Sequence, residues 1–550
     1  MPRPPLPVRL RRRVPVRLRQ NWRLIAVGCA FLAVVGGLLG DGRVRPLVTS
    51  SELVTATTVT TDVAGTRDLF DSTVGHDVRV TFADADYRRM LATFTADGEK
   101  EYVHADLTVD GTLIRDVGIR LKGNSTLMTL RRGNGNAPGR QGGNAPGGQG
   151  EQGANAPGGQ GGQGGNAPGR QGASYSTDAP ESLPWLIRFD AFVEGRRYQG
   201  HRDVAVRPAG MGRSTALTEA LALALVARAG EPAEEFSFAS FRVNDRPAAA
   251  RLLVAVPDEE YAESLGSPGV LYKALSTGSF SYQGEDPTEY TEDFRQITRR
   301  GSQDLQPVID LVRWVDRSSD TEFADHLADR VDVSAVARYA ALQNLLLNAD
   351  DMAGPGKNYY LWYDLTTRRT RVLTWDLNLA FSGDATLGPH DTLSMGGPGR
   401  GAGWGAGPGA DQGEAPTPPE GFTPPEGFTP PEGFTPPEGF TPPEGFTPPE
   451  GFDGAPGARG GPGGMGGNRL KERFLATDAF TDDYESAYRE LYATLYADGT
   501  ALRLLDTLST ALAATSGADT TAVTSDTDAL RRTIEQRTEA LADDEVITRS

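Results

Sequence analysis

Two tracts of biased composition constrain how this 550-residue chain can fold. Residues 132–172 contain NAPG four times among Gly and Gln, and residues 394–467 contain TPPEGF six times in succession. Neither tract has enough apolar side chains to offset the entropy lost on ordering. The core must therefore be assembled from residues 66–131, 173–393 and 468–550, which together suffice for a sizeable core.

Each tract allows more than one interpretation. The first is expected to be a flexible insertion within a folded domain, which either serves as a lid or is a surface addition without such a role. The Pro pairs of the second favour extended polyproline II and predict a semi-rigid spacer. Alternatively, its threonines accept sugar or phosphate and its phenylalanines contact a partner.

The N-terminus predicts a membrane anchor. Residues 1–23 carry eight arginines and no acid, and residues 24–40 form an apolar run of seventeen. As a helix that run spans about 26 Å, just enough to cross a bilayer core. The arginines predict a cytoplasmic N-terminus and an extracytoplasmic body, with residues 41–65 as a linker. A cleaved signal peptide is the alternative, although no clear A-x-A site follows.

Composition limits the possible ligands. The net charge of −18 disfavours nucleic acid and anionic membrane as partners of the body, so any phosphate must be held by a local cationic pocket or a metal. The single cysteine, Cys29, excludes an intrachain disulfide and a cysteine-based zinc site, and the five histidines lack ligand spacing. Carboxylate and amide oxygens remain, which favour Mg²⁺, Mn²⁺ or Ca²⁺.

Periodicity predicts an α+β fold. HDVRVTFADADYRRMLATF predicts a strand, an Asp-rich cap and a helix, and a DG turn within 101–126 predicts a hairpin. Residues 214–230 predict a helix, FSFASFRVNDRPAAARLLVAV two strands, and PGVLYKALSTGSFSY a strand pair. Further helices are expected before residue 348, with Asp332 or Ser334 as one N-cap, and after residue 468.

NADDMAGPGKNYYLWYD, residues 348–364, is the segment richest in possible chemistry. It is expected to enter a hairpin of strands 358–364 and 370–376. A turn centred on Thr367 would place Asn358 opposite Asp376, close enough to share a divalent cation. A shift of the strand pairing by one residue would send one of the two side chains to the opposite face of the hairpin.

The order of helix, acidic loop, Asn, hairpin and Asp is also the order of the protein-kinase site. Asp350 and Asp351 would then lie where kinases place the catalytic Asp. The alternative is a loop whose acids cap backbone amides. An EF-hand Ca²⁺ site is disfavoured by the spacing.

Cations and an aromatic ring could complete such a site. Arg120 and Lys122 share one strand face, and the GN turn after them can present backbone amides to an anion. Tyr272 and Lys273 could supply a stacking ring and a further cation. Glu219 could orient a lysine, as the helix glutamate of kinases does. The alternative for each is an ordinary solvated side chain.

The chain resembles the spore coat protein H (CotH) kinase-like family. The resemblance covers most of the folded body and rests on several motifs in order, among them RLKGNST, IRFDAFVEGRRYQG, GVLYKA, NADDMAGPGKNYYLWYD and TWDLNLAF. It implies an atypical protein-kinase-like two-lobed fold and phosphate transfer from ATP with Mg²⁺ or Mn²⁺. It implies Asp350 as the catalytic Asp, with Asp351 beside it, and Asp376 as a metal ligand.

The same resemblance implies a metal or phosphate contact at Asn358. It makes Arg120, Lys122, Asn124 and Ser125 candidates for the nucleotide phosphates. Three departures leave an inactive pseudokinase open: Thr374 replaces a Pro, Asn378 an Asp, and Arg188 a Lys. In addition, Asn358 follows Asp350 by eight residues, where the kinase catalytic loop has five.

The resulting expectation is a membrane-anchored phosphotransferase that modifies Ser or Thr hydroxyls of a protein, or a cell-wall component. The alternative is a non-catalytic surface scaffold whose repeats bind partners, because free ATP is scarce outside the membrane. A third possibility is transfer of another nucleotide-derived group.

Overall fold

The computed structural model describes residues 59–123, 127, 130, 175–210, 213–393 and 467–549. The predicted anchor at 24–40 lies outside these ranges, as do nearly all of the two biased tracts. None of the helices within the described ranges is both long and apolar enough to cross a membrane.

The described residues form an α+β fold that contains a closed seven-stranded barrel in the order β2-β3-β4-β5-β7-β9-β8. Neighbouring strands are antiparallel except β2 and β8, which are parallel. The strands are β2 (Gly75–Thr81), β3 (Val103–Val109), β4 (Thr112–Leu121), β5 (Trp185–Arg188), β7 (Asp203–Arg207), β8 (Phe236–Val243) and β9 (Ala249–Ala255).

Local sequence explains the barrel strands. Val78 and Val80 of β2 are buried while Asp77 and Arg79 are not, the alternation expected of a strand with one face on a core. The predicted DG hairpin is confirmed: Asp110 and the glycine after it have φ of 47° and 85°, which suits a tight turn between β3 and β4.

A second sheet has the order β11-β10-β12-β13. Its strands are β10 (Gly269–Ala274), β11 (Phe294–Gln296), β12 (Tyr359–Asp364) and β13 (Thr370–Thr374), all antiparallel to their neighbours. One face of this sheet contributes to the largest core, and the other carries a small cluster that includes Tyr360, Trp362 and Trp375.

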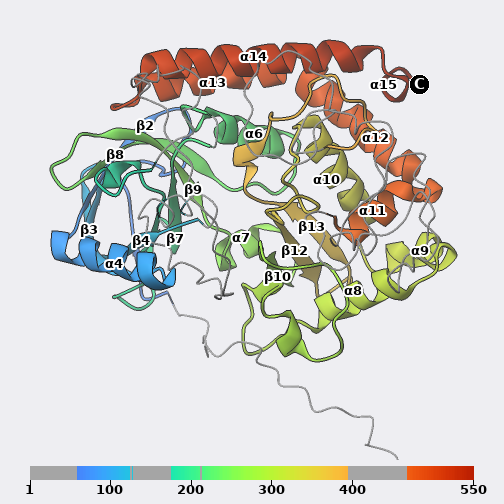
Figure 1. The fold of residues 1–550 in the computed structure, drawn as a ribbon, viewed down its shortest axis with the longest axis horizontal. Coiled ribbons are helices and arrows are strands. Elements are labelled where there is room, and N and C mark those ends of the chain that lie inside the picture. Colours follow the sequence, from blue (N-terminus) through green and yellow to red (C-terminus); the bar gives the residue numbers. More distant parts are fainter. Residues whose placement is uncertain are drawn as a thin grey trace, which may run out of the picture.

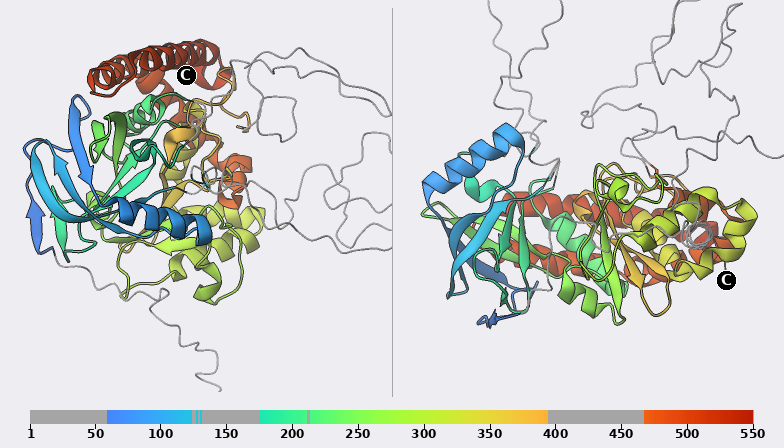
Figure 2. Two further views of the ribbon diagram at one scale, coloured as in Figure 1. Left: turned by 60° about the vertical axis from the view of Figure 1, so that its left-hand side comes forward. Right: turned by 90° about the horizontal axis from the view of Figure 1, so that it is seen from below.

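Helices surround this sheet and cover one side of the barrel (Figures 1 and 2). They are α4 (Asp84–Asp97), α6 (Leu217–Arg228), α7 (Glu259–Ser264), α8 (Gln306–Arg317), α9 (Asp320–His326), α10 (Val333–Leu345), α11 (Arg469–Ala476), α12 (Thr481–Tyr492), α13 (Thr500–Ala514), α14 (Thr520–Ala542) and α15 (Glu545–Thr548). In α10 the expected cap is confirmed, because the Asp332 side chain accepts a hydrogen bond from the Ala335 N–H at 3.1 Å.

The C-terminal helices complete the main core. Helix α12 packs on α10, while α13 and α14 pack on α6. Helix α14 runs above both the barrel and the helical part (Figure 1). Residues 468–550, which follow the second biased tract, therefore belong structurally to the same folded body as residues 213–393.

Three local predictions need correction. Only the first half of PGVLYKALSTGSFSY is a strand: β10 pairs with β11 and β12, because residues 275–293 form a loop organised by Asp293, which accepts a hydrogen bond from the Ser279 N–H at 2.7 Å. The predicted linker 41–65 contains a short strand, β1 (Thr61–Val63), paired with β6 (Arg196–Tyr198). The Asp-rich cap of α4 is absent, since Ala83 at the N-cap position makes no side-chain hydrogen bond.

Candidate active site

Asp376 lies just beyond β13, in a left-handed backbone conformation with φ 57° and ψ 67°. Such a conformation is unfavourable for a residue other than glycine, asparagine or aspartate, and it aims this side chain away from the course of the strand. The Oδ1 atom of Asp376 accepts a hydrogen bond from Nη1 of Arg207 at 2.6 Å. About a third of the Asp376 side chain, 31%, is exposed.

Arg207 connects three elements. It is the last residue of β7, and its Nη1 also lies 2.6 Å from Oε1 of Glu219 on α6. Burial acts to lower the pKa of Arg207, but Glu219 and Asp376 outweigh it and raise that pKa. Sequence reasoning missed this arginine; the available signal was a charged residue ending the apolar run VAVR.

Glu219 was expected to orient a lysine, and the structure pairs it with Arg207 instead. Its side chain is only 4% exposed. Burial raises the pKa of Glu219 to about 7, although Arg207 opposes this rise. A carboxylic acid with this pKa exchanges its proton near neutrality, so the charge on this ion pair is sensitive to a bound ligand.

A second buried carboxylate, Glu234, lies within electrostatic reach of the same group. It is 3% exposed, and neither side-chain oxygen has a hydrogen-bond partner among the described residues. Burial raises the pKa of Glu234 to about 7, and Arg207 partly opposes the shift. Sequence reasoning did not single it out, because nothing in EPAEEF distinguishes it from its solvated neighbours.

Two lysines complete the cluster around the indole of Trp375. The Nζ atoms of Lys273 and Lys122 lie 4.1 Å and 5.2 Å from the centre of the ring, and Cζ of Arg207 lies 5.1 Å from it. Cations over an indole face are attracted by its quadrupole. The structure therefore gathers three cations around one ring, next to the Asp376 carboxylate.

The charges of this cluster perturb one another. Burial lowers the pKa of Lys273 to about 8, although Asp376 opposes the shift. Burial, Lys273 and Arg207 hold the pKa of Lys122 well below its ordinary value. Burial alone would raise the pKa of Asp376, but Arg207 and the two lysines hold it below its usual range. An anionic ligand would relieve the repulsion among these three cations.

Asp350 and Asn358 are in direct contact. The Asn358 side-chain amide donates to Oδ2 of Asp350 at 2.9 Å and to its carbonyl oxygen at 3.0 Å. The Gly356 N–H donates to Oδ1 of Asp350 at 2.6 Å. A Cβ at Gly356 would lie 2.6 Å from both partners, so only glycine permits this close approach.

The Asp350 carboxyl is also perturbed. Burial raises its pKa to about 6, with smaller contributions from the negative charges of Asp376 and Asp351, while the hydrogen bond from Gly356 opposes the shift. This carboxyl is thus fixed by two donors and able to exchange a proton near neutral pH.

Asp351 is placed differently. Its carboxylate forms an ion pair with Lys471 of α11 and accepts a hydrogen bond from the Ala353 N–H at 2.8 Å. The residue is 2% exposed. Both oxygens of this carboxylate are therefore engaged, and Asp351 connects this loop to the C-terminal helices.

The predicted hairpin exists, but its register differs by one residue. The paired positions run from Tyr359 opposite Thr374 at the open end of the hairpin to Tyr363 opposite Thr370 beside the turn. Asn358 and Asp376 therefore lie just outside the strands and are not directly opposed. The turn sets this register. The Asp364 side chain accepts hydrogen bonds from the N–H groups of Thr366 and Thr367, and the centre of the turn lies half a residue before the predicted centre at Thr367.

Other predicted site residues lie elsewhere. Tyr272 is fully buried on the opposite face of β10 from Lys273, and its hydroxyl donates to the Asp304 carbonyl at 2.7 Å, so it is not available for stacking on a ligand. Arg120 packs over the Tyr102 ring at 5.0 Å. Asn124 and Ser125 lie outside the described residues.

Few oxygen donors are available to a metal at this site. Within the described ranges, no three or more His, Cys, Asp or Glu side chains are arranged to hold an ion. The oxygen donors at hand are Asp350, Asp376 and the amide oxygen of Asn358, whose nitrogen is used on Asp350. Mg²⁺ and Mn²⁺ in proteins are usually held by one or two carboxylates, with water and phosphate oxygens in the remaining positions, so the chemistry of these donors is compatible with either ion.

The fold and the site define an α+β protein with a partly buried cluster of cations and carboxylates beside a barrel. The family model described as CotH kinase protein matches residues 171–419. This match supports the assignment of the chain to the CotH kinase-like family. No curated protein matches the chain.

The matched range covers most of the candidate site. It includes Arg207, Glu219, Lys273, Asp350 and Asp376. Strands β2 to β4 precede it, and Lys122 with them, whereas α11 to α15 follow it. The residues beyond the match are nevertheless part of the same barrel and the same core.

Proposed function

We propose that this chain is a phosphotransferase that uses ATP with Mg²⁺ or Mn²⁺ to phosphorylate Ser or Thr hydroxyls of a protein. The observation that carries the proposal is the convergence of Lys122, Lys273 and Arg207 on Trp375 and Asp376. The family assignment supports a kinase-like function. In this proposal the barrel and the helical part act as the two lobes of a kinase-like fold.

The cations would hold the nucleotide phosphates. Each lysine is partly buried, so water solvates its charge incompletely, and its lowered pKa expresses this cost. Phosphate oxygens would replace the missing solvation. Phosphoryl transfer depends largely on positioning and charge stabilisation, which is what a preformed group of cations supplies.

Asp376 and the amide oxygen of Asn358 would hold the divalent metal. When bound, such an ion neutralises negative charge on the transferred phosphoryl group. Arg207 already neutralises Asp376, so binding would require the two cations to share or exchange this carboxylate. The proposal therefore links metal binding to the ion pair between Arg207 and Asp376.

Asp350 would accept the proton of the substrate hydroxyl. Its hydrogen bonds from Gly356 and Asn358 fix the carboxylate, and its pKa of about 6 keeps it largely ionised at neutral pH. The substrate hydroxyl is taken to belong to a protein outside the membrane, with residues 24–40 as the anchor. A cell-wall component is a further possible substrate.

A non-catalytic scaffold is the second candidate, and specific observations favour it. Asp376 is ion-paired, and Arg188, at a position where a lysine is frequent, is held in a two-pronged contact by Asp203 at 2.8 and 3.0 Å. In this alternative the TPPEGF repeats would carry the interactions with partners.

One experiment separates the two candidates. Purified full-length protein is titrated with ATP in the presence of Mg²⁺ or Mn²⁺ by calorimetry, beside Asp376→Ala and the matched control Glu539→Gln, an exposed carboxylate on α14. The phosphotransferase proposal expects metal-dependent binding that Asp376→Ala abolishes and the control retains. No binding with either metal, or equal binding by Asp376→Ala, would favour the scaffold.

A further inference from the structure

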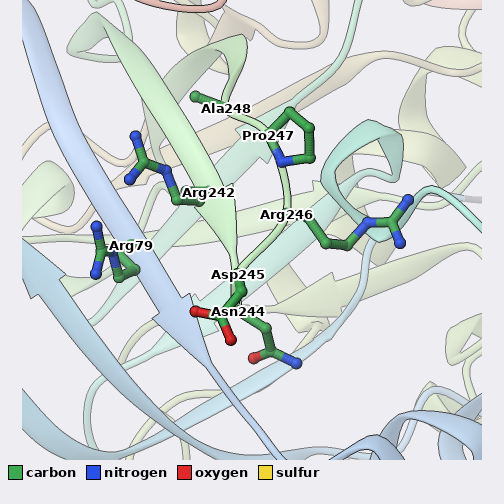
Figure 3. Close-up of a pocket in the computed structure, with 7 residues that line it drawn as sticks. All are labelled: Arg79, Arg242, Asn244, Asp245, Arg246, Pro247 and Ala248. Atoms are coloured by element: carbon green, nitrogen blue, oxygen red, sulfur yellow. The ribbon is translucent and has the colours of Figure 1, made fainter.

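A shallow pocket lies on the outside of the barrel, at the ends of β2 and β8. Its volume is about 340 Å³, and it shares no residue with the candidate active site. Figure 3 shows the side chains that line it: Arg79, Arg242 and the loop residues 244–248.

Arg79 and Arg242 are direct neighbours across two parallel strands. Like charges in adjacent positions of a sheet destabilise it. Among the described residues, neither guanidinium forms an ion pair or hydrogen bond with a protein group. Figure 3 shows both side chains extended toward the same side of the loop. Two cations are thus held together, and no carboxylate among the described residues forms an ion pair with either of them.

The surroundings of this arginine pair are fixed by other contacts. Arg246 is turned away from the pair in Figure 3, and its guanidinium is held by Glu181, with Nη2 at 3.2 Å from Oε1. The Asn244 side-chain oxygen accepts from the Phe82 N–H at 3.0 Å. Asp245 also lines the pocket, but forms no ion pair with either free arginine. The pocket is therefore preformed, and its two free guanidinium groups remain available.

We propose that Arg79 and Arg242 form a binding site for a phosphate group of a small ligand. A guanidinium presents a rigid fork of donors that matches a tetrahedral oxyanion, and two adjacent forks surround it from two sides. The acidic chain as a whole repels anions, so two unpaired arginines in register mark a local exception. Free phosphate and the phosphates of a nucleotide share this chemistry.

Equilibrium dialysis of the full-length protein with radiolabelled inorganic phosphate, and separately with ATP, tests the proposal. Three variants are compared: the double variant Arg79→Gln/Arg242→Gln, the charge reversal Arg242→Glu, and Arg115→Gln, which removes an exposed arginine elsewhere on the barrel. Lys273→Met is included to report on the candidate active site.

The double variant and the charge reversal are expected to weaken phosphate binding by about 10-fold or more, whereas Arg115→Gln and Lys273→Met retain this site. Arg242→Glu should also keep or raise the melting temperature, because it replaces a like-charge pair with an opposite pair. Because the candidate active site is expected to bind ATP by itself, the number of ATP molecules bound per chain is compared. Loss of free phosphate binding with an unchanged number of bound ATP molecules would assign the site to free phosphate, and loss of one bound ATP per chain in the double variant would include nucleotides. Phosphate binding unchanged in Arg242→Glu, or lost only in Lys273→Met, would overturn the proposal.

Discussion

The carboxylate of Asp376 and the guanidinium of Arg207 lie 2.6 Å apart, although 169 positions separate them in the chain. The contact joins the end of a barrel strand to the second residue beyond the end of the second sheet. It also neutralises the carboxylate that the family resemblance assigns to a metal. Metal affinity should therefore depend on how firmly Arg207 holds Asp376.

Replacement of Arg207 by glutamine is expected to tighten the binding of Mn²⁺ alone by about 10-fold, because it removes the cation that competes for Asp376. The same change should weaken ATP binding, because it removes one of three cations. Electron paramagnetic resonance of free Mn²⁺ and calorimetry with ATP measure the two effects. The double variant Arg207→Gln/Glu219→Gln, which also removes the charge of the glutamate paired with Arg207, controls for misfolding. Mn²⁺ affinity that does not change in either variant would contradict competition by Arg207.

Glu234 predicts a stability change with a definite dependence on pH. Its folded-state pKa of about 7 lies above its ordinary value of 4.5, so the folded protein binds the extra proton between these values. Stability associated with this residue is therefore fully present below pH 4.5 and lost as the pH rises through 7. The loss amounts to about 3 kcal/mol.

Glu234→Gln should consequently raise the free energy of unfolding by up to about 3 kcal/mol at pH 8 and change it little at pH 5. Urea denaturation at the two pH values measures this difference. Glu539→Gln, on the exposed face of α14, should show no such dependence. Equal effects of Glu234→Gln at both pH values would mean that the buried carboxylate is not the cause.

Much of the fold could be predicted from local patterns. The DG turn, the alternation in β2 and the Asp332 cap each depend on neighbouring residues alone. The partners of β10 could not be predicted in this way, because β11 and β12 reach it from 20 or more residues away in the chain. Barrel closure by the parallel pair β2 and β8 is likewise a long-range contact without a local signal.

The candidate site shows the same limit. Residues 348–364 predict Asp350 and Asn358 as site residues because acids and amides cluster there, and the motif TWDLNLAF predicts Asp376. Arg207 and Glu234 stand in unremarkable local contexts and matter only through the residues that folding brings beside them. The register of the hairpin was wrong by one residue, because the side chain of Asp364 organises a turn that strand patterns do not reveal.

Lys273 predicts proton uptake on ligand binding. Its pKa in the folded protein is about 8, below the ordinary 10.5, so at pH 8.5 much of it is neutral. An anion bound beside it favours the charged form, and binding should take up a fraction of one proton. Calorimetry of ATP binding in buffers with different ionisation enthalpies measures this uptake. The uptake should disappear in Lys273→Met; uptake that persists in this variant would assign the proton to another group.

The stability associated with the same lysine depends on pH in the opposite direction to that of Glu234. Unfolded chains keep the lysine protonated up to pH 10.5, so stability should rise with pH between 8 and 10.5 as the folded protein loses the proton first. Lys273→Met is therefore expected to stabilise the protein by about 2–3 kcal/mol at pH 7 and by less at pH 10. Thermal denaturation at the two pH values measures this difference, and a destabilised Lys273→Met at pH 7 would contradict it.

Asp526 connects the C-terminal helices to the element that carries Glu219. Its Oδ2 atom accepts hydrogen bonds from the N–H groups of Ser214 and Thr215, at 3.1 and 2.8 Å, and from the Thr215 hydroxyl at 2.7 Å. These donors lie just before α6, so a carboxylate from α14 satisfies backbone N–H groups in the segment that leads into this helix. Asp526→Ala should lower the free energy of unfolding by about 2 kcal/mol, because it leaves these donors unpaired.

Because α6 also positions Glu219 against Arg207, the variant should weaken ATP binding together with stability. The neighbouring substitution Asp528→Ala on the same helix is the matched control. Denaturation by urea and calorimetry with ATP measure the two quantities, and a stability loss without any change in ATP binding would show that α14 supports the fold but not the position of Glu219.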